Sequence, residues 1–322
     1  MSEPTVKIPS KRRAQGAGLA LVPVVVAAFL GFLSLPRAVP PDEVPLPEVD
    51  GRALEKTRAI EDHLIANFDR EGLVGDVRAL GSALRAYHRA QLDGTADTAA
   101  TKQDVERARA LAVGTAGMEK VHALFVVQRT AFFREVAAYE STGVESDELR
   151  ELGGAFLPRL RQAGWVRDHR ILASDDERRV LYKMMWGLDV GLDQDAPFVL
   201  DLEERRILYR LYLRLPHPPE HLRVTLAKAK EHARDAAECA KVEDEERAMA
   251  EKWRVSKITV LGEFDPTYPT EYALGIAHYR LGDYVASAAD FRRHLDRHPS
   301  GPLTLRAQNY LKAALQAAEG TL

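Results

Sequence analysis

The segment Ala14–Pro36, AQGAGLALVPVVVAAFLGFLSLP, contains no charged residue. A helix of about 20 apolar residues is long enough to cross the roughly 30 Å hydrocarbon core of a bilayer. We therefore expect a transmembrane anchor over residues 14–36. Because an anchor of this kind places everything that follows it on one side of a membrane, it constrains the organisation of the chain more than any other feature.

Basic residues are concentrated before this apolar segment, whereas Arg37 and then acidic residues follow it. Lys11, Arg12 and Arg13 precede it, and a basic flank marks the cytoplasmic side of a membrane helix. Residues 1–13 then form a short cytoplasmic tail, and the bulk of the chain lies outside the cytoplasm, as in a single-pass inner-membrane protein. A cleaved signal peptide is the alternative. No small-x-small cleavage pattern follows the segment, however, because Pro36 stands two residues before Ala38.

A proline-rich linker follows the predicted anchor. Residues 37–50 include four prolines, at positions 40, 41, 45 and 47. Such spacing favours an extended, polyproline-like conformation. We expect this linker to act as a spacer that lifts the folded part of the protein off the bilayer.

Beyond the linker, apolar residues recur at helical spacing, and the sequence shows no convincing strand pattern. This periodicity predicts an all-α fold, with an α-helical region over 51–217 and charged, alanine-rich helices over 218–265. Trp165, Trp186 and Trp253 are single aromatic residues in helical context, which indicates core packing. The first five helices are expected at about 51–69, 73–92, 102–113, 117–140 and 146–163.

Two decamers follow the same pattern: ERRVLYKMMW at Glu177–Trp186 and ERRILYRLYL at Glu204–Leu213. What is repeated is a basic start and an apolar stripe, which indicates packing rather than a duplicated catalytic motif. Ser174 stands three residues before Glu177, the spacing of a capping box that begins a helix. Both decamers are therefore predicted to be amphipathic helices that occupy matching places in a helical stack.

The region around residue 230 shows a different spacing. Apolar residues step by three and four positions, which is the pattern of a heptad seam and predicts an intramolecular helical hairpin. The charged run at 241–247, KVEDEER, is expected to interrupt the seam. The residues of the seam are Leu222, Leu226, Ala229, Ala233, Ala236 and Ala240.

The segment Tyr272–Pro299 combines a glycine for close helix packing, Gly275, with a turn at Gly282–Asp283, a seam at Phe291 and Leu295, and a stop at Pro299. In these positions the chain resembles a tetratricopeptide repeat (TPR) over about 266–318. Ser287 and His294 depart from the family's pattern, which favours alanine there. The resemblance implies a TPR-like hairpin with a terminal capping helix over 266–322.

In the repeats that this segment resembles, the first helix of each pair lines a groove that binds protein. Here that helix covers about 268–281, and Tyr272, Ile276, Tyr279 and Arg280 share one of its faces. Tyrosine and arginine are enriched at binding hot spots, so these four residues are the predicted protein-binding stripe. The alternative is that preceding helices cover this face and the tyrosines belong to a core.

The sequence offers little for chemistry. A net charge of −3 provides no field that would attract nucleic acid. The single cysteine, Cys239, excludes an internal disulfide and a cysteine-rich zinc site. His294 and His298 have a spacing that can hold a metal, but no third ligand is evident. With no phosphate loop, dinucleotide motif or nucleophile elbow, we expect no cofactor and no metal.

Together these features predict a membrane-anchored, extracytoplasmic helical-repeat scaffold that holds other proteins of the cell envelope and is not an enzyme. Two alternatives remain at this point. A sensor or regulator could pass a signal across the membrane, although the cytoplasmic tail at 1–13 is too short for a folded domain. An enzyme could assemble an unrecognised site from scattered polar residues.

Overall fold

The computed structural model describes residues 43–71, 73–94, 98–214 and 220–320. About three quarters of these residues are helical and strands are nearly absent, which confirms the all-α prediction. In chain order the helices are α2 Gly51–Glu71, α3 Gly75–Asp93, α4 Thr98–Ala116, α5 Met118–Thr142, α6 Asp147–Gly153, α7 Phe156–Gln162, α8 Asp175–Val190, α9 Leu202–Arg214, α10 Glu220–Glu231, α11 Ala236–Phe264, α12 Thr270–Arg280, α13 Tyr284–Arg297 and α14 Thr304–Gly320.

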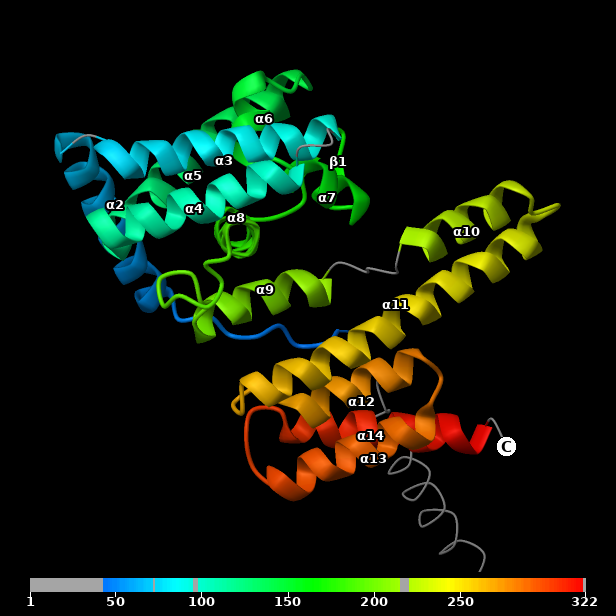
Figure 1. Ribbon diagram of the computed structural model, residues 1–322. Coiled ribbons are helices and arrows are strands. Elements are labelled where there is room, and N and C mark those ends of the chain that lie inside the picture. The colour runs from blue at the N-terminus through cyan, green and yellow to red at the C-terminus, as the bar shows by residue number, and fades with distance from the viewer. Residues whose placement is uncertain (1–42, 72, 95–97, 215–219, 321–322) are drawn as a thin grey trace, which may run out of the picture.

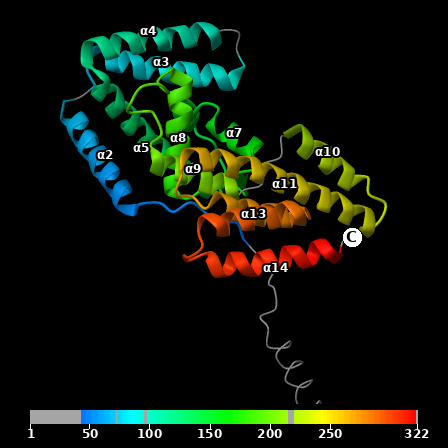
Figure 2. The same cartoon turned by 90° about the horizontal axis from the view of Figure 1, so that it is seen from below.

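The helices pack around two separate hydrophobic cores, which appear as an upper and a lower group in Figure 1. The first core is built by α2–α9, and the second by the later half of α11 with α12–α14. Helix α9 lies between the groups, and it contributes Leu211 to the first core and Leu213 to the second. Figure 2 shows the lower helices stacked in the order α11, α13 and α14.

The repeated decamers form the helices α8 and α9. Ser174 and Glu177 make the predicted capping box at the start of α8. Asp201 and Glu204 exchange the same pair of hydrogen bonds at the start of α9, a cap that the sequence analysis did not identify. Each glutamate also binds a cation of the other helix. Glu204 accepts from Lys183 at 2.6 Å, and Glu177 accepts from Arg214 at 2.7 Å.

The single helix predicted over 146–163 is wrong, because the chain breaks at Gly154 into α6 and α7. The backbone of Gly154 has a φ of +47°, which favours glycine over other residues. A Cβ on Gly153 would lie 2.3 Å from the ring of Phe132. The two glycines therefore let the chain turn while α5 packs closely against it.

A short hairpin follows α7, although no strand was predicted. Strands β1 (Val166–Arg167) and β2 (Arg170–Ile171) pair in antiparallel register. Asp168 and His169 both have positive φ, the backbone geometry of a tight two-residue hairpin turn. With two residues in each strand, the hairpin is too short to produce an alternating pattern in the sequence.

The intramolecular hairpin predicted around residue 230 is present, because α10 and α11 pack against each other and Lys230 pairs with Glu246. The seam predicted over 222–240 does not run through one helix, however. Helix α10 ends at Glu231, and Asp235 caps the start of α11 by accepting from the backbone of Glu238. The seam residues Ala229, Ala236 and Ala240 are exposed. Helix α11 continues through the charged run at 241–247, because solvated Glu, Lys and Arg are good helix formers.

The described part of the linker, residues 43–50, has no regular secondary structure but is not a free spacer. Val44 is buried in the second core. The Tyr268 hydroxyl donates to the carbonyl of Pro45 at 2.6 Å, and the backbone N–H of Asp50 donates to Glu203 at 2.7 Å. In Figure 1 this blue segment runs from α2 beneath α9 toward the C-terminal helices. Residues 43–50 of the predicted spacer are therefore docked on the folded part of the protein.

The predicted tail at 1–13 and the predicted anchor at 14–36 lie outside the described residues. None of the helices in the described part of the chain combines the length and the apolar character needed to cross a bilayer.

Helices α12 and α13 form an antiparallel hairpin. Three cross-contacts define its register, namely Glu271 with Arg297, Gly275 with Phe291, and His278 with Asp290. Gly282 turns the chain between the helices with a φ of +78°. A Cβ on Gly275 would lie 2.8 Å from the Phe291 ring. The local roles predicted for Gly275 and Gly282 are therefore present in the structure.

We predict that Gly275→Leu destabilises the C-terminal helices, because the new side chain would overlap the buried Phe291 ring. Overpacking of this kind costs typically ~1–3 kcal/mol of unfolding free energy. Gly114→Leu is the matched control, since Gly114 lies in a helix and a Cβ there would have no neighbouring atom within 4 Å. Thermal unfolding measures both variants, and a Gly275→Leu protein that melts like the parent would contradict the packing described here.

Candidate functional site

Two of the four residues in the predicted binding stripe do not lie at the surface. Tyr272 and Ile276 are buried in the second core, so they are not available to a partner. The Tyr272 ring contacts Phe291 of α13 and Tyr310 of α14, with ring centroids 5.8 and 5.9 Å apart. The face predicted to line a groove is therefore covered by neighbouring helices, which was the alternative interpretation of these residues.

The other two residues of the stripe lie at the half-buried end of α12. The ring of Tyr279 packs against Tyr284, with centroids 5.1 Å apart. Arg280 lies 3.5 Å from the carboxylate of Glu251 on α11, and Arg254 approaches the same carboxylate to 3.2 Å. Arg280 thus contacts α11 and Tyr279 contacts the start of α13, and the four predicted residues do not form one continuous binding face.

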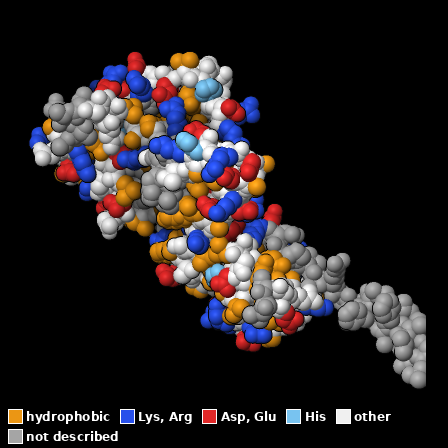
Figure 3. All heavy atoms as spheres, turned by 90° about the vertical axis from the view of Figure 1, so that its right-hand side faces the viewer, with side chains coloured by type: hydrophobic (Ala, Val, Ile, Leu, Met, Phe, Trp, Pro, Cys, Tyr) orange, Lys and Arg blue, Asp and Glu red, His pale blue; other side chains and the backbone are white. Residues whose placement is uncertain are grey.

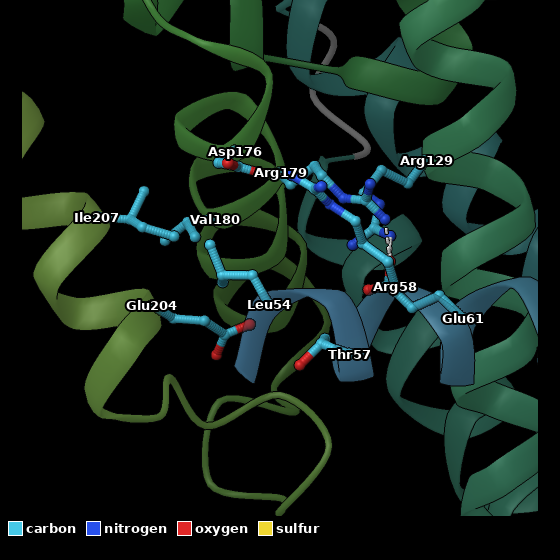
Figure 4. Close-up of a pocket in the computed structure, with 10 residues that line it drawn as sticks. All are labelled: Leu54, Thr57, Arg58, Glu61, Arg129, Asp176, Arg179, Val180, Glu204 and Ile207. Atoms are coloured by element: carbon cyan, nitrogen blue, oxygen red, sulfur yellow. Dashed lines mark hydrogen bonds and ion pairs between the residues drawn. The ribbon is translucent and has the colours of Figure 1, made fainter. Parts of the chain in front are cut away.

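A buried charge cluster lies where α2, α5 and α8 meet, and Figure 4 shows its arginines converging on Glu61. Arg129 lies 2.5 Å from the Glu61 carboxylate, and Arg179 binds the same carboxylate. Glu61 and Arg129 are both buried. Beside them, Arg58 pairs with Asp176 at 2.5 Å.

The space in this cluster is about 30 Å³, roughly the volume of one water molecule. It is too small for a substrate, and each carboxylate that faces it has a cationic partner. Burial alone raises the pKa of Glu61, but the charges and hydrogen bonds of Arg129 and Arg179 outweigh burial, and its pKa lies below the ordinary value. The cluster therefore acts as a structural junction between helices.

An apolar stripe on α11 is exposed to solvent. It comprises Trp253, Val260 and Phe264, whose exposed fractions are 39%, 36% and 48%. Spacings of seven and four residues place the three side chains on one face of the helix. The prediction that Trp253 packs in a core is therefore wrong. The spacing of these residues can be read from the sequence. It does not single out an exposed face, however, because the opposite face of α11 is apolar too.

Cationic side chains border this stripe on the side of α9. The guanidinium of Arg205 lies over the Phe264 ring at 4.8 Å, and Lys257 Nζ lies 5.2 Å from the Tyr212 ring. Burial and the charge of Arg254 lower the pKa of Lys257 to about 8, so most of its charge is retained at neutral pH. Figure 3 shows hydrophobic side chains gathered along the middle of one face of the molecule, bordered by basic and acidic groups.

A larger cavity, of about 520 Å³, lies beside the second core where residues 45–48 meet the α11–α12 and α13–α14 loops. His294 and His298 both line it, with ring centroids 5.0 Å apart. The described residues contain no group of three or more His, Cys, Asp or Glu side chains that could hold a metal ion.

Comparison of this chain with protein-family models, with curated proteins and with solved structures finds no match. The geometry of its own side chains is therefore the basis for assigning a function. Two features stand out for a role in binding: the exposed stripe on α11 and the cavity that contains His294.

We predict that Glu61→Gln strongly destabilises the fold at neutral pH, because it leaves Arg129 buried without a counter-charge. Breaking a buried pair from one side costs ~3–5 kcal/mol. Asp104→Asn is the control, since its pair with Arg107 is exposed and the unfolding free energy should hardly change.

The same variant has an expected pH dependence. The folded-state pKa of Glu61 is depressed, so the folded protein binds fewer protons at this site than the unfolded chain does. The stabilisation by Glu61 is complete above its ordinary pKa of 4.5 and is lost as the pH falls through the lower folded-state value. Chemical denaturation should show the gap between wild type and Glu61→Gln shrinking in acid. A gap that stays constant down to pH 3 would contradict this account.

Proposed function

We propose that the protein is a membrane-anchored helical scaffold whose body lies outside the cytoplasm and holds partner proteins of the cell envelope. The observation that carries this proposal is the exposed stripe of Trp253, Val260 and Phe264 on α11. Scattered apolar residues are common on protein surfaces, but a large aromatic pair aligned on one helix face is typical of an interaction site.

The stripe supports one kind of occupant, an amphipathic helix of a partner. Residues spaced by seven and four positions along α11 match the spacing with which one helix presents side chains to another. Arg205 and Lys257 border the stripe with positive charge. A partner helix with an apolar face and flanking acidic residues would complement both features.

The docking of residues 43–50 on the folded part of the protein supports a location of the C-terminal helices close to the membrane. If the anchor ends near residue 36, the seven residues up to Glu43 span at most about 25 Å when fully extended. Val44 is already buried in the second core. The C-terminal helices, with α11 among them, are then held near the bilayer surface, where a membrane-bound partner is within reach.

We predict a single membrane crossing with the C-terminus outside the cytoplasm, because Lys11, Arg12 and Arg13 flank the apolar segment. An enzyme reporter that needs disulfides should be active when it is joined after Asp50, since disulfides form outside the reducing cytoplasm. A cytoplasmic reporter at the same junction should be silent. The opposite pattern of activity would exclude this topology.

We predict that a photo-crosslinking amino acid placed at Trp253 in the full chain captures a discrete partner in membranes of the source cells. The same amino acid at Val285 is the control, because Val285 is 74% exposed but lies on α13, away from the stripe. Trp253→Ser combined with Val260→Ser should abolish co-purification of that partner, while circular dichroism should show that the helical fold is kept. Equal crosslinking at both positions, or none at Trp253, would contradict the proposed binding surface.

A further inference from the structure

An uncharged and exposed loop joins α13 to α14. The segment between His298 and Arg306, PSGPLTL, carries no charge. Residues 299–302 are exposed, and Leu305 in the first turn of α14 has an exposed fraction of 69%. Single exposed leucines are common on protein surfaces, so the surroundings of this loop decide whether it is a binding surface.

Further exposed apolar side chains lie at the same end of the C-terminal helices. Leu46 is 40% exposed, and it lines the cavity of about 520 Å³ together with residues 300–304. The α11–α12 loop lies at this end too, as Figure 1 shows, and it contributes the exposed Pro266 to the lining of the same cavity. The apolar side chains exposed at this end are thus Leu46, Pro266, Pro302 and Leu305.

Charged side chains surround this apolar end. Arg297 pairs with Glu271 but keeps 65% of its side chain exposed, and His298 and Arg306 are exposed on either side of the loop. Glu48 and Asp296 are exposed as well, so the end has no strong excess of positive charge. An apolar tip within a ring of charged groups suits the boundary between lipid headgroups and acyl chains, where each kind of side chain finds its own environment.

The chain enters the folded part of the protein beside this loop. Glu43 is the first described residue, and Pro45 and Leu46 share the cavity with the α13–α14 loop. If the proposed anchor ends near residue 36, the residues up to Glu43 span at most about 25 Å. A tether this short keeps the loop at an effective concentration on the order of millimolar near the bilayer, so that even a weak contact forms.

We propose that the α13–α14 loop binds the surface of the bilayer in which the chain is anchored, with Leu305, Pro302 and Leu46 entering the boundary between headgroups and acyl chains. Arg297 and Arg306 then lie among the lipid phosphates. The inference rests on the proposed anchor, and it adds the part of the folded body that contacts lipid. Such a contact would fix the orientation of the C-terminal helices, and of the stripe on α11, relative to the membrane.

Fluorescence quenching in bilayer discs tests the proposal with the full chain. Leu305→Cys carries the fluorophore nitrobenzoxadiazole, and Cys239→Ser removes the single native cysteine. The discs contain phosphatidylcholine and phosphatidylglycerol, with or without a lipid that bears a nitroxide near the top of its acyl chain. We expect the nitroxide to lower the fluorescence at least about twofold, because side chains at this boundary lie ~5–10 Å deep.

Val285→Cys is the matched control for the label. Val285 is 74% exposed and apolar, but it lies near the start of α13, at the opposite end of the helix from the loop. Twelve residues separate it from Arg297, which is roughly 18 Å along the helix. The label at this position should keep its fluorescence. Equal quenching at Leu305 and Val285, or none at Leu305, would overturn the proposal.

A second experiment moves the label away from the mutated residue. The fluorophore is placed on Ser300→Cys, and Leu305→Asp or Val285→Asp is added, both at exposed positions that the fold should tolerate. Leu305→Asp should remove most of the quenching, because a charge at the boundary opposes entry of the loop, whereas Val285→Asp should leave it unchanged. Quenching at Ser300 that survives Leu305→Asp would also overturn the proposal.

The lipid contact and the proposed function fail in different ways. A chain that co-purifies with the discs but shows no quenching at Leu305 would remove the lipid contact and leave the anchored scaffold standing. A chain that does not enter the discs would remove the anchor and the lipid contact together. Quenching at Leu305 with no partner captured at Trp253 would support the lipid contact and remove the stripe on α11 as the docking surface.

Discussion

The attachment of α9 to both hydrophobic cores is the contact on which the rest of the structure depends. Leu211 faces the first core and Leu213 the second, so one helix belongs to both. Arg206 secures the second attachment through Asp265, whose pKa is lowered chiefly by its hydrogen bond with Arg206. Without this helix, the described N-terminal and C-terminal groups would be joined mainly by the segment before α2. Because the pair is largely buried, its loss would leave an uncompensated charge between the cores.

This arrangement explains the role of the repeated decamers, which is to join helices. In each copy the glutamate closes the start of its own helix, and the second arginine reaches another element: Arg179 binds Glu61 on α2, and Arg206 binds Asp265 after α11. The repeat is thus a device for joining helices, used once inside the first core and once between the two. It also positions α11, because Arg205 and Tyr212 of α9 contact Phe264 and Lys257, at the edge of the exposed stripe.

The features that the sequence predicted well depend on a few neighbouring residues. Ser174 and Glu177 cap α8 through groups three positions apart, and Gly275 and Gly282 act within one hairpin.

The features that the sequence did not predict depend on contacts between distant segments. Tyr272 and Ile276 are buried because α14 and α11 return to cover them, and Val44 is buried against helices more than two hundred residues later. His294 stood out in the sequence for its spacing from His298 and as a departure from the repeat pattern. Its cavity could not be foreseen, because it is assembled from four separate parts of the chain. The exposed stripe was hidden because both faces of α11 carry apolar side chains.

The proposed function requires that an amphipathic partner helix docks on α11 near a membrane surface. The most direct measurement is a structure of the full chain isolated from its native membrane in a bilayer disc, together with the proteins that remain bound. The account predicts a partner helix along Trp253, Val260 and Phe264, with acidic groups beside Arg205 and Lys257. A complex in which that face stays open to solvent, while a partner is bound elsewhere, would contradict it.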